Sequence, residues 1–319
     1  MTNTKKIKIE VPHRISGFFE IVDEINGNKI NNPEKIGSRG AGFCLSAVGK
    51  TDIEIENLSK KEDFEISIYI NGKRFDQKAE TTHYIIEYIK NYVKNPIKIK
   101  VNHRFDLPVG CGFGASGSGA LGTIFGLNYL LNLKLSYYER GRIAHIAEVK
   151  NKTGLGTVCG QLGRGLCMLK KPGYPCVSER INVPEGIKII CGTFGMIHTK
   201  SILKSESLRP RIKKAGKRAL QKLIAEKSIN TFTRASIEFV KETNILSVLN
   251  LTKTKDLMED LNKLDIIGAS MNQLGRSVFA IGYEHNVNNI LEVFESFQPG
   301  IKIFNLSVGN SYPRIIRQK

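Results

Sequence analysis

The sequence lacks the long apolar run that a membrane-spanning helix needs. Such a helix takes about 18 or more apolar residues, and the nearest approach, residues 119–133, is interrupted by Gly122, Gly126, Asn128 and Asn132. We therefore expect residues 119–133 to form a buried helix. The first residues also lack the apolar core of a signal peptide and pass from lysines directly into an alternating strand pattern. This start predicts a cytoplasmic protein without a membrane partner.

Closely spaced cysteine pairs are also missing. The six cysteines form no C-x-x-C pair, and none lies at close ligand spacing from a histidine. A zinc site and a disulfide framework are therefore not expected. The composition, 41% hydrophobic and 24% charged residues, is close to that of an average globular chain, and 319 residues suit two domains.

Acidic residues are few relative to basic ones. The chain has 48 Lys and Arg against 30 Asp and Glu, a net charge of +18, which suits nucleic acid, anionic metabolites or a salt-rich medium. Residues 199–227 supply ten basic residues against only Glu206 and Glu226. Because few aromatic residues interleave with these charges, we interpret the segment as a solvated helix face in preference to a nucleic-acid stripe. We expect no nucleic-acid partner.

Apolar periodicity predicts a mixed α and β fold. Turn residues at 172–173 and 184–186 bracket a boundary, which gives domains of residues 1–185 and 186–319. In the first domain we predict strands at 7–11, 52–56, 65–70 and 97–101, and helices at 81–93, up to about 131, and 136–150. In the second we predict strands at 187–191, 277–282 and 301–306, and helices at 212–226, 231–241, 253–264 and 287–297. The fold class is α+β.

A glycine-rich stretch follows the strand predicted at 97–101. From Gly110 to Gly119, five of the ten residues are glycine. Each glycine costs about 0.5–1 kcal/mol relative to alanine in regular structure, so the cluster requires a reason. Without Cβ atoms, the N–H groups of the loop and of the following helix can converge on a phosphate. The alternative is a flexible turn or tight helix packing.

Several known phosphate loops do not fit this stretch. It contains no G-x-x-x-x-G-K-[ST] motif. Gly112, Gly114 and Gly117 match G-x-G-x-x-G, but a second helix, opened by a capping box at Ser136 and Glu139, follows where a dinucleotide-binding fold requires a strand. No H-R-D or D-F-G triplet supports a protein-kinase loop.

The loop resembles that of the GHMP kinases (galactose, homoserine, mevalonate and phosphomevalonate kinases). The family pattern P-x-x-x-G-x-G-x-S is matched by Pro108, Gly112, Gly114 and Ser116, with Ala115 in place of the first of two serines. Residues 11–20 resemble the first family motif and residues 269–280 the carboxy-terminal one. The runs G-S-R-G-A-G-F at 37–43 and T-G-L-G at 153–156 resemble the archaeal pantoate kinases in particular.

This resemblance implies a two-domain GHMP kinase fold, with a first domain that resembles a ribosomal-protein domain and a ferredoxin-like second domain. It implies ATP and Mg²⁺ as cofactors, pantoate as the small-molecule substrate, a product used in coenzyme A biosynthesis, and a homodimer. Two alternatives stay open. The chain could phosphorylate another small alcohol, such as a mevalonate-like or homoserine-like compound, or it could be a non-catalytic relative that binds nucleotide or nucleic acid.

The resemblance also assigns roles to residues. Ser116 and Glu148 are the expected metal ligands and catalytic residues, although Glu148 could instead pair at the surface with Lys150 or Lys152. An unpaired carboxylate near a helix end is disfavoured by about 0.3–1 kcal/mol, and a bound cation would offset this. The expected nucleotide-binding residues are Pro108, Gly110, Gly112, Phe113, Gly114, Ala115, Ser116, Gly117 and Ser118.

The chain departs from the family pattern at one catalytic position. Where pantoate kinases have an aspartate directly after T-G-L-G, this chain has Thr157, which cannot act as a general base at neutral pH. Either positioning and electrostatics suffice for the transfer, as a loose transition state permits, or the protein is impaired or has another substrate. His13 and Arg14 also replace the expected Gly-His pair, and residues 305–309 replace an acidic strand end.

The carboxylate of pantoate requires a cation or backbone N–H groups. Arg39, between glycines with Ser38 beside it, is the expected ligand, supported by Arg14 and Ser16. The alternative for Arg39 is a surface salt bridge. His145, among apolar residues of a predicted helix, is expected to be a hydrogen-bonded interior residue and not a catalyst.

Overall fold

The strand patterns of the first half form one large, mostly antiparallel sheet in the computed structural model, which describes residues 4–58, 63–197 and 199–316. Its order is β10-β9-β5-β8-β6-β7; β5 also pairs with β1 and β2, β1 pairs with β15, and only the described pair β6 and β8 is parallel. The strands are β1 (Lys5–Arg14), β2 (Phe18–Val22), β5 (Gly37–Asn57), β6 (Glu65–Ile70), β7 (Lys73–Arg74), β8 (Ile97–Phe105), β9 (Leu166–Leu169), β10 (Ser178–Ile181) and β15 (Arg314–Ile316).

The central strand β5 is much longer than the segment predicted at 52–56. Its first half contains the G-S-R-G-A-G-F run and is buried on both faces, so it shows no alternation of apolar and polar residues. Two of its glycines permit a close strand contact. A Cβ atom on Gly40 would lie 2.3 Å from the carbonyl oxygen of Phe18, and one on Gly42 would lie 2.0 Å from that of Ile15. These glycines therefore have a packing role.

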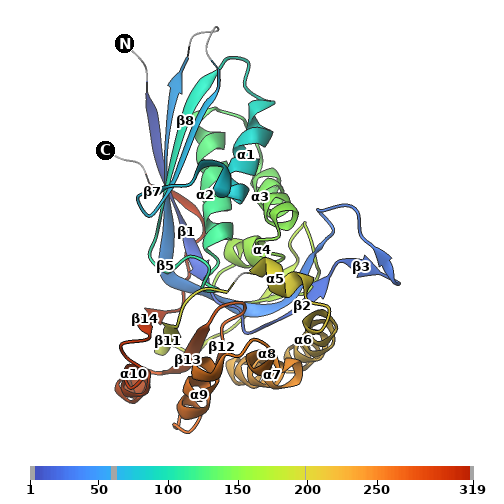
Figure 1. Cartoon of the computed structure of the whole chain (residues 1–319), viewed down its shortest axis with the longest axis vertical. Helices are drawn as coiled ribbons and strands as arrows, with labels where there is room; N and C mark the ends of the chain where they lie inside the picture. The colour runs from blue at the N-terminus through green and yellow to red at the C-terminus, as the bar shows by residue number, and fades with distance from the viewer. Residues whose placement is uncertain (1–3, 59–62, 198, 317–319) are drawn as a thin grey trace.

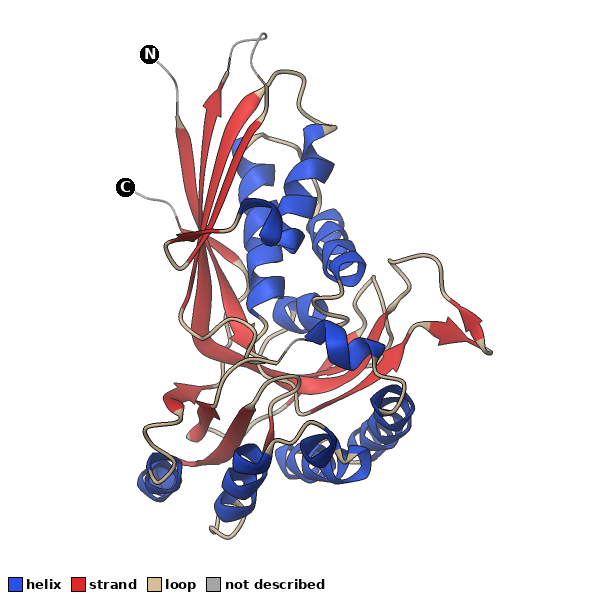
Figure 2. Cartoon of the chain, in the orientation of Figure 1, coloured by secondary structure: helices blue, strands red, loops and turns tan. Residues whose placement is uncertain are grey.

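Helices cover one side of this sheet (Figures 1 and 2). They are α1 (Glu80–Lys90), α2 (Ala115–Leu130), α3 (Tyr137–Asn151) and α4 (Thr157–Leu162). Helix α2 is almost entirely buried, as predicted, and Gly122 packs directly on Thr51 of β5. Helix α3 begins with the predicted capping box, in which Glu139 N–H donates to Ser136 Oγ and Ser136 N–H donates to Glu139 Oε2.

The second half forms a four-stranded antiparallel sheet of order β12-β13-β11-β14 with helices packed against it. Its strands are β11 (Ile187–Thr193), β12 (Gly268–Met271), β13 (Ser277–Tyr283) and β14 (Lys302–Ser307). Its helices are α5 (Thr199–Lys204), α6 (Leu208–Ala225), α7 (Ile229–Thr243), α8 (Ile245–Val248), α9 (Thr252–Leu261) and α10 (Val287–Glu295). A hairpin of β3 (Glu24–Ile25) and β4 (Asn28–Lys29) and the 3₁₀ turns η1 (Asp76–Lys78) and η2 (Glu284–Asn286) complete the described elements. The predicted α+β fold is confirmed.

One hydrophobic core joins the two halves. The rings of Phe43 in β5 and Phe232 in α7 are 5.2 Å apart, and the same Phe232 lies 6.1 Å from Phe279 in β13. The chain also returns to the first sheet at its end, where β15 pairs with β1. A boundary between residues 185 and 186 stays a prediction.

The basic stretch 199–227 lies mostly on α6, which buries an apolar stripe and exposes the opposite face. At least six of its ten basic side chains pair with acidic ones. Arg209 and Lys213, for example, both pair with Asp23. These pairs agree with the interpretation as a solvated face.

The cysteine prediction is wrong at one pair. Cys159 in α4 and Cys176 form a disulfide, with a sequence separation of 17 residues and no motif to mark the pairing. The other four cysteines, Cys44, Cys111, Cys167 and Cys191, are free and buried. Among the described residues, no helix is both long and apolar enough to cross a membrane.

Candidate active site

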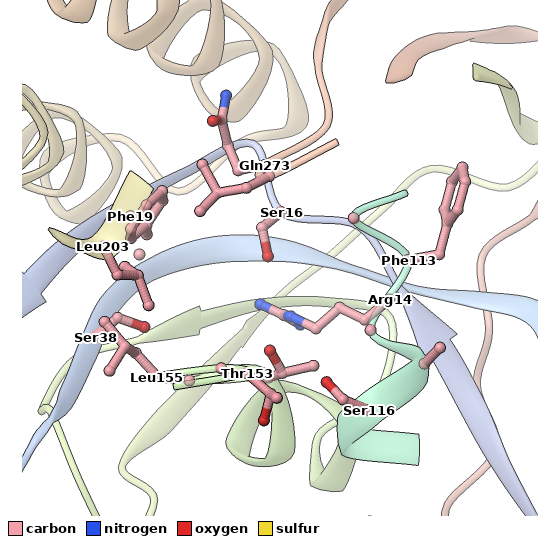
Figure 3. Close-up of a pocket in the computed structure, with 18 of the residues that line it drawn as sticks. Arg14, Ser16, Phe19, Ser38, Phe113, Ser116, Thr153, Leu155, Leu203 and Gln273 are labelled. Carbon is pink, nitrogen blue, oxygen red and sulfur yellow. The ribbon is translucent and has the colours of Figure 1, made fainter. Parts of the chain in front are cut away.

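A cavity of about 410 Å³ lies where the glycine-rich loop, β5 and α4 meet the second half of the chain (Figure 3). Of the predicted site residues it is lined by Arg14, Ser16, Ser38, Arg39, Gly110, Gly112, Phe113, Gly114, Ala115, Ser116 and Thr157. Residues that were not predicted also line it, among them Phe19, Lys152, Thr153, Leu155, Lys200, Leu203 and Gln273.

The glycine-rich loop has a backbone that only glycine adopts easily. Gly110, Gly112 and Gly114 have φ angles of 77°, 86° and 70°, in the left-handed region. Gly114 directly precedes the first residue of α2. The free N–H groups and positive dipole end of α2 therefore face the cavity beside the loop, which is an arrangement that binds phosphate.

Side chains from distant parts of the chain hold this loop in place. Gln161 Nε2 donates hydrogen bonds of 2.9 Å to the carbonyl oxygens of Gly114 and Pro12. Ser277 Oγ of β13 donates to the carbonyl oxygen of Cys111 at 2.8 Å. Gln161 was not predicted, although its position four residues after Thr157 places both on one face of α4.

His13 also contacts the loop, through a 2.8 Å hydrogen bond between Nδ1 and the carbonyl oxygen of Phe113. The carbonyl can only accept, so Nδ1 carries the proton. Burial lowers the pKa of His13 to about 4, which leaves the ring neutral at physiological pH. His13 therefore serves the loop as an uncharged donor.

Glu148 is a buried carboxylate next to the start of α2. It is 1% exposed, so the alternative of a surface pair with Lys150 or Lys152 is wrong. Its Oε1 accepts a hydrogen bond from Thr153 Oγ1 at 3.0 Å, whereas Oε2 is buried without a partner among the described residues. Burial raises the pKa of Glu148, and hydrogen bonds from Ser116 and Thr153 oppose the rise.

Thr157, the residue that replaces the expected aspartate, lies between the glycine loop and Glu148. A Cβ atom on Gly154 would be 2.2 Å from Glu148 Oε2 and 3.0 Å from Thr157 Oγ1. Both oxygens therefore face the same small space in front of Gly154. Thr157 Cγ2 packs on the other side, 2.9 Å from the Cβ position of Gly114.

The two predicted arginines differ in how their charges are compensated. Arg39 forms a two-point ion pair with Glu20, with Nε 2.9 Å from Oε2 and Nη2 2.7 Å from Oε1. Arg14 is 3% exposed, and its guanidinium donates to the carbonyl oxygens of Gly42, Gly160 and Cys167, at 3.1, 3.4 and 3.4 Å. None of the ion pairs within residues 4–58, 63–197 and 199–316 involves Arg14.

Three predicted nucleotide-binding residues do not line the cavity: Pro108, Gly117 and Ser118. Ser118 is fully buried, and its Oγ donates to the carbonyl oxygen of Val11 at 3.2 Å, which fastens α2 to β1. Gly117 lies behind the loop, where a Cβ atom would be 2.5 Å from Gln161 Oε1. His145 is an interior residue, as predicted, with Nε2 3.0 Å from the carbonyl oxygen of Ile36.

The carboxy-terminal motif at 269–280 completes the cavity wall. Asn272 Oδ1 accepts a hydrogen bond from Ser16 N–H at 3.1 Å, and Gln273 N–H donates to the carbonyl oxygen of Ser16 at 2.9 Å. The turn between β12 and β13 thus fixes a segment 256 residues earlier in the chain. This connection explains why the first and last motifs contribute to one site.

All the charged side chains that line the cavity in the described part of the chain are basic: Arg14, Arg39, Lys152 and Lys200. Lys200 of α5 also pairs with Glu80 of α1, at 2.8 Å from Oε1. A cleft lined by one sign of charge attracts ligands of the opposite sign. The site is suited to two anionic ligands, one at the glycine loop and one at Arg14.

Comparison with known proteins agrees with this geometry. The family model of the GHMP kinases N terminal domain matches residues 80–162. The chain is 31% identical to a pantoate kinase of Methanocaldococcus jannaschii, over 89% of this chain and 96% of that protein. It is 30% identical to a pantoate kinase of Thermococcus kodakarensis, over 86% and 87% respectively. A solved structure described as a phosphotransferase related to the CoA biosynthesis pathway matches with a TM-score of 0.85 and 26% identity, over 98% of this chain and 99% of that one.

Proposed function

Because the chain belongs to the pantoate kinase family within the GHMP kinases, we propose that it transfers the terminal phosphoryl group of ATP to the primary hydroxyl of (R)-pantoate. The product is (R)-4-phosphopantoate, a compound for coenzyme A biosynthesis. The observation that carries the proposal is one cavity that combines a glycine-rich phosphate loop with a buried arginine lacking any acidic partner among the described residues. Such a cavity accommodates both a nucleotide and an anionic acceptor.

Ser116 and Glu148 fit a divalent cation. The buried oxygen Glu148 Oε2 lacks a partner within the described residues, and the Ser116 hydroxyl is close enough to the same carboxylate to lower its pKa. Mg²⁺ prefers one or two such oxygen ligands together with substrate phosphates and water. When bound, the ion neutralises charge that develops on the transferred phosphoryl group. Ser116 and Glu148 would hold the ion beside the loop.

Thr157 orients the acceptor hydroxyl in this proposal. Its own hydroxyl can hydrogen-bond the alcohol but cannot remove the proton at neutral pH. Phosphoryl transfer depends mainly on positioning and electrostatic stabilisation, so the residues that align the two substrates carry most of the catalysis. We therefore expect an active but slow enzyme, not an inert relative.

Arg14 is the residue that we propose for the carboxylate of pantoate, with the hydroxyls of Ser16 and Ser38 beside it. Its three bonds to backbone carbonyls use three of the five N–H donors of a guanidinium. Its charge has no acidic partner among the described residues, so it is available to a carboxylate in the cavity. Arg39 lines the same cavity, but Glu20 already occupies its two-point donor edge, so Arg39 is the secondary candidate.

A panel of acceptors tests the proposal. ADP release is measured with Mg-ATP and pantoate, mevalonate or homoserine, and thermal melts are recorded with and without Mg-ATP. We expect pantoate to give the highest kcat/KM, and nucleotide at 100 times its Kd to stabilise the protein by about 2.7 kcal/mol. A higher kcat/KM with mevalonate or homoserine would identify that compound, and not pantoate, as the substrate. No effect of Mg-ATP would contradict a kinase.

We further propose a cytoplasmic homodimer. Light scattering after size-exclusion chromatography tests the assembly, and a mass of one chain would contradict it. Most cytoplasms keep cysteines reduced, so Cys159 and Cys176 would exist there as a dithiol.

A further inference from the structure

The cavity has an apolar side at the end where the guanidinium of Arg14 lies. Phe19 of β2, Leu155 of the loop before α4 and Leu203 of α5 line it. Figure 3 shows these side chains around the tip of Arg14, on the side away from Phe113 of the glycine loop. An apolar surface beside a buried cation is costly to hydrate, so it indicates a ligand that carries both a charge and a compact apolar group.

We propose that Phe19, Leu155 and Leu203 bind the two methyl groups on C3 of pantoate and thereby select it over dihydroxy acids that lack them. This inference rests on the proposed pantoate kinase function. Pantoate is 2,4-dihydroxy-3,3-dimethylbutanoate, in which one quaternary carbon separates the carboxylate end from the hydroxyl that is phosphorylated. Its apolar group is therefore central, with polar groups at both ends.

The cavity offers a position for each polar end of pantoate. Ser116 marks one end, at the start of α2, and the guanidinium of Arg14 marks the other (Figure 3). A pantoate molecule with its carboxylate on Arg14 and its 4-hydroxyl directed toward Ser116 can turn its C3 methyl groups toward the apolar side of the cavity. Leu155 and Leu203 lie on that side, beyond the guanidinium of Arg14 as seen from Ser116 (Figure 3).

Leu203 is fixed in this position by polar contacts of its helix. The carbonyl oxygen of Leu203 accepts a 2.7 Å hydrogen bond from Arg209 Nη1, and Arg209 Nη2 pairs with Asp23 at 2.6 Å. One turn earlier, Lys200 pairs with Glu80. The Leu203 side chain is 8% exposed. A preformed apolar surface of this kind discriminates by contact, because no reorganisation is needed before the methyl groups bind.

The expected selectivity follows from the free energy of binding the two methyl groups. One methylene in an apolar pocket changes kcat/KM by about 10- to 200-fold. We therefore expect the wild-type enzyme to prefer pantoate over 2,4-dihydroxybutanoate, which lacks only the two methyl groups, by about 10-fold or more. Replacing Leu203 by alanine removes part of the contact with pantoate but none with the smaller acid, so the ratio should fall.

The test measures kcat/KM for both acids in the wild type, Leu203→Ala, Leu155→Ala and the control Ile202→Ala. Ile202 precedes Leu203 on α5, is 1% exposed and does not line the cavity, so its truncation reports the general cost of a hole in this helix. Leu155 is only half-buried, and its variant serves if Leu203→Ala does not fold. Dissociation constants of the two acids, measured calorimetrically without ATP, give an independent ratio.

We expect Leu203→Ala and Leu155→Ala each to lower the preference for pantoate about 5- to 10-fold, because each removes part of a contact of the kind that one methylene makes. Ile202→Ala should keep the wild-type ratio of the two kcat/KM values. Equal efficiency with both acids in the wild type would overturn the apolar site while leaving the kinase function intact. An unchanged ratio in both leucine variants would do the same. If neither acid is phosphorylated, the proposed function itself fails, and the apolar site with it.

Discussion

Thr153 donates a hydrogen bond to Oε1 of the buried Glu148 at 3.0 Å, while Oε2 of the same carboxylate lacks a partner within the described part of the chain. A buried carboxylate with one hydrogen-bonded oxygen and one oxygen without a partner is positioned to bind a ligand through the second oxygen. The first two predictions follow from this asymmetry.

Glu148→Gln should lower kcat by orders of magnitude and weaken its dependence on Mg²⁺, because a neutral amide is a poor ligand for a hard cation. The measurement is kcat over a series of Mg²⁺ concentrations at saturating ATP and pantoate. Glu259→Gln, an exposed position on α9, is the control and should behave as wild type. Wild-type rates of Glu148→Gln at low Mg²⁺ would remove Glu148 from the metal site.

The same variant should be more stable than the wild type at neutral pH without metal. Burial raises the pKa of Glu148 above its ordinary value of 4.5, so the folded protein retains this proton to a higher pH than the unfolded chain does. Stability is therefore lost as the pH rises from about 4.5 through the raised pKa. Thermal melts between pH 4.5 and 7 should show the advantage of Glu148→Gln growing with pH. A constant difference would mean that Glu148 ionises normally.

Arg14→Lys and Arg39→Lys should have different effects. A lysine keeps the charge but loses the planar fork that binds a carboxylate at two points. We expect Arg14→Lys to raise KM for pantoate more than KM for ATP. Arg39→Lys should break the two-point pair with Glu20 and lower the melting temperature, with similar changes in both KM values. If Arg39→Lys instead raised KM for pantoate more than KM for ATP, the carboxylate of pantoate would be assigned to Arg39.

Thr157→Asp should raise kcat in the presence of Mg²⁺, by less than the 10²- to 10⁴-fold that a general base typically contributes, and Thr157→Ala should lower it modestly. The gain requires the cation, because without it the repulsion between the new carboxylate and Glu148 would favour protonation of one of the two. Rates of the three proteins are compared at one saturating Mg-ATP concentration. A tenfold or greater loss in Thr157→Asp with an unaffected Thr157→Ala would place position 157 outside the chemistry.

Reduction of the disulfide should lower the melting temperature. The bridge between Cys159 and Cys176 closes a loop over a sequence separation of 17 residues, and loops of this size typically contribute about 2–4 kcal/mol. Melts with and without dithiothreitol measure the effect. Cys176→Ser should melt like the reduced wild type and should not respond to the reductant. Equal melting of oxidised and reduced wild type would contradict a stabilising bridge.

Local patterns predicted much of the fold. The strand at Glu65–Ile70 and the capping box at Ser136 are both found where the sequence places them, because they depend on alternation and on short-range hydrogen bonds. The first half of β5 was not predicted, since a strand buried on both faces does not alternate. Short strands such as β12 depend on distant partners and leave little trace in the sequence.

The site was also predicted only in part, because only some of its residues belong to local motifs. The glycine loop and Ser116 belong to a local motif, and the cavity contains them. Leu203 contributes through tertiary placement, which no local spacing reveals, whereas the spacing of Gln161 four residues after Thr157 was a local signal that was not used. The pairing of Arg39 with Glu20 depends on the register between β5 and β2. Because Glu20 compensates the charge of Arg39, Arg14 is the better candidate for the carboxylate of pantoate.

The pairing of β15 with β1 has a consequence for how the protein is made. The first sheet receives this strand only after the whole second half has been synthesised, and Phe43 of β5 packs on Phe232 from that half. A ribosome-bound chain that has emerged only as far as residue 185 would expose an unpaired edge at β1 and an uncovered apolar face on β5. Such surfaces promote association between chains. The nascent first half is therefore prone to associate with other chains until translation is complete.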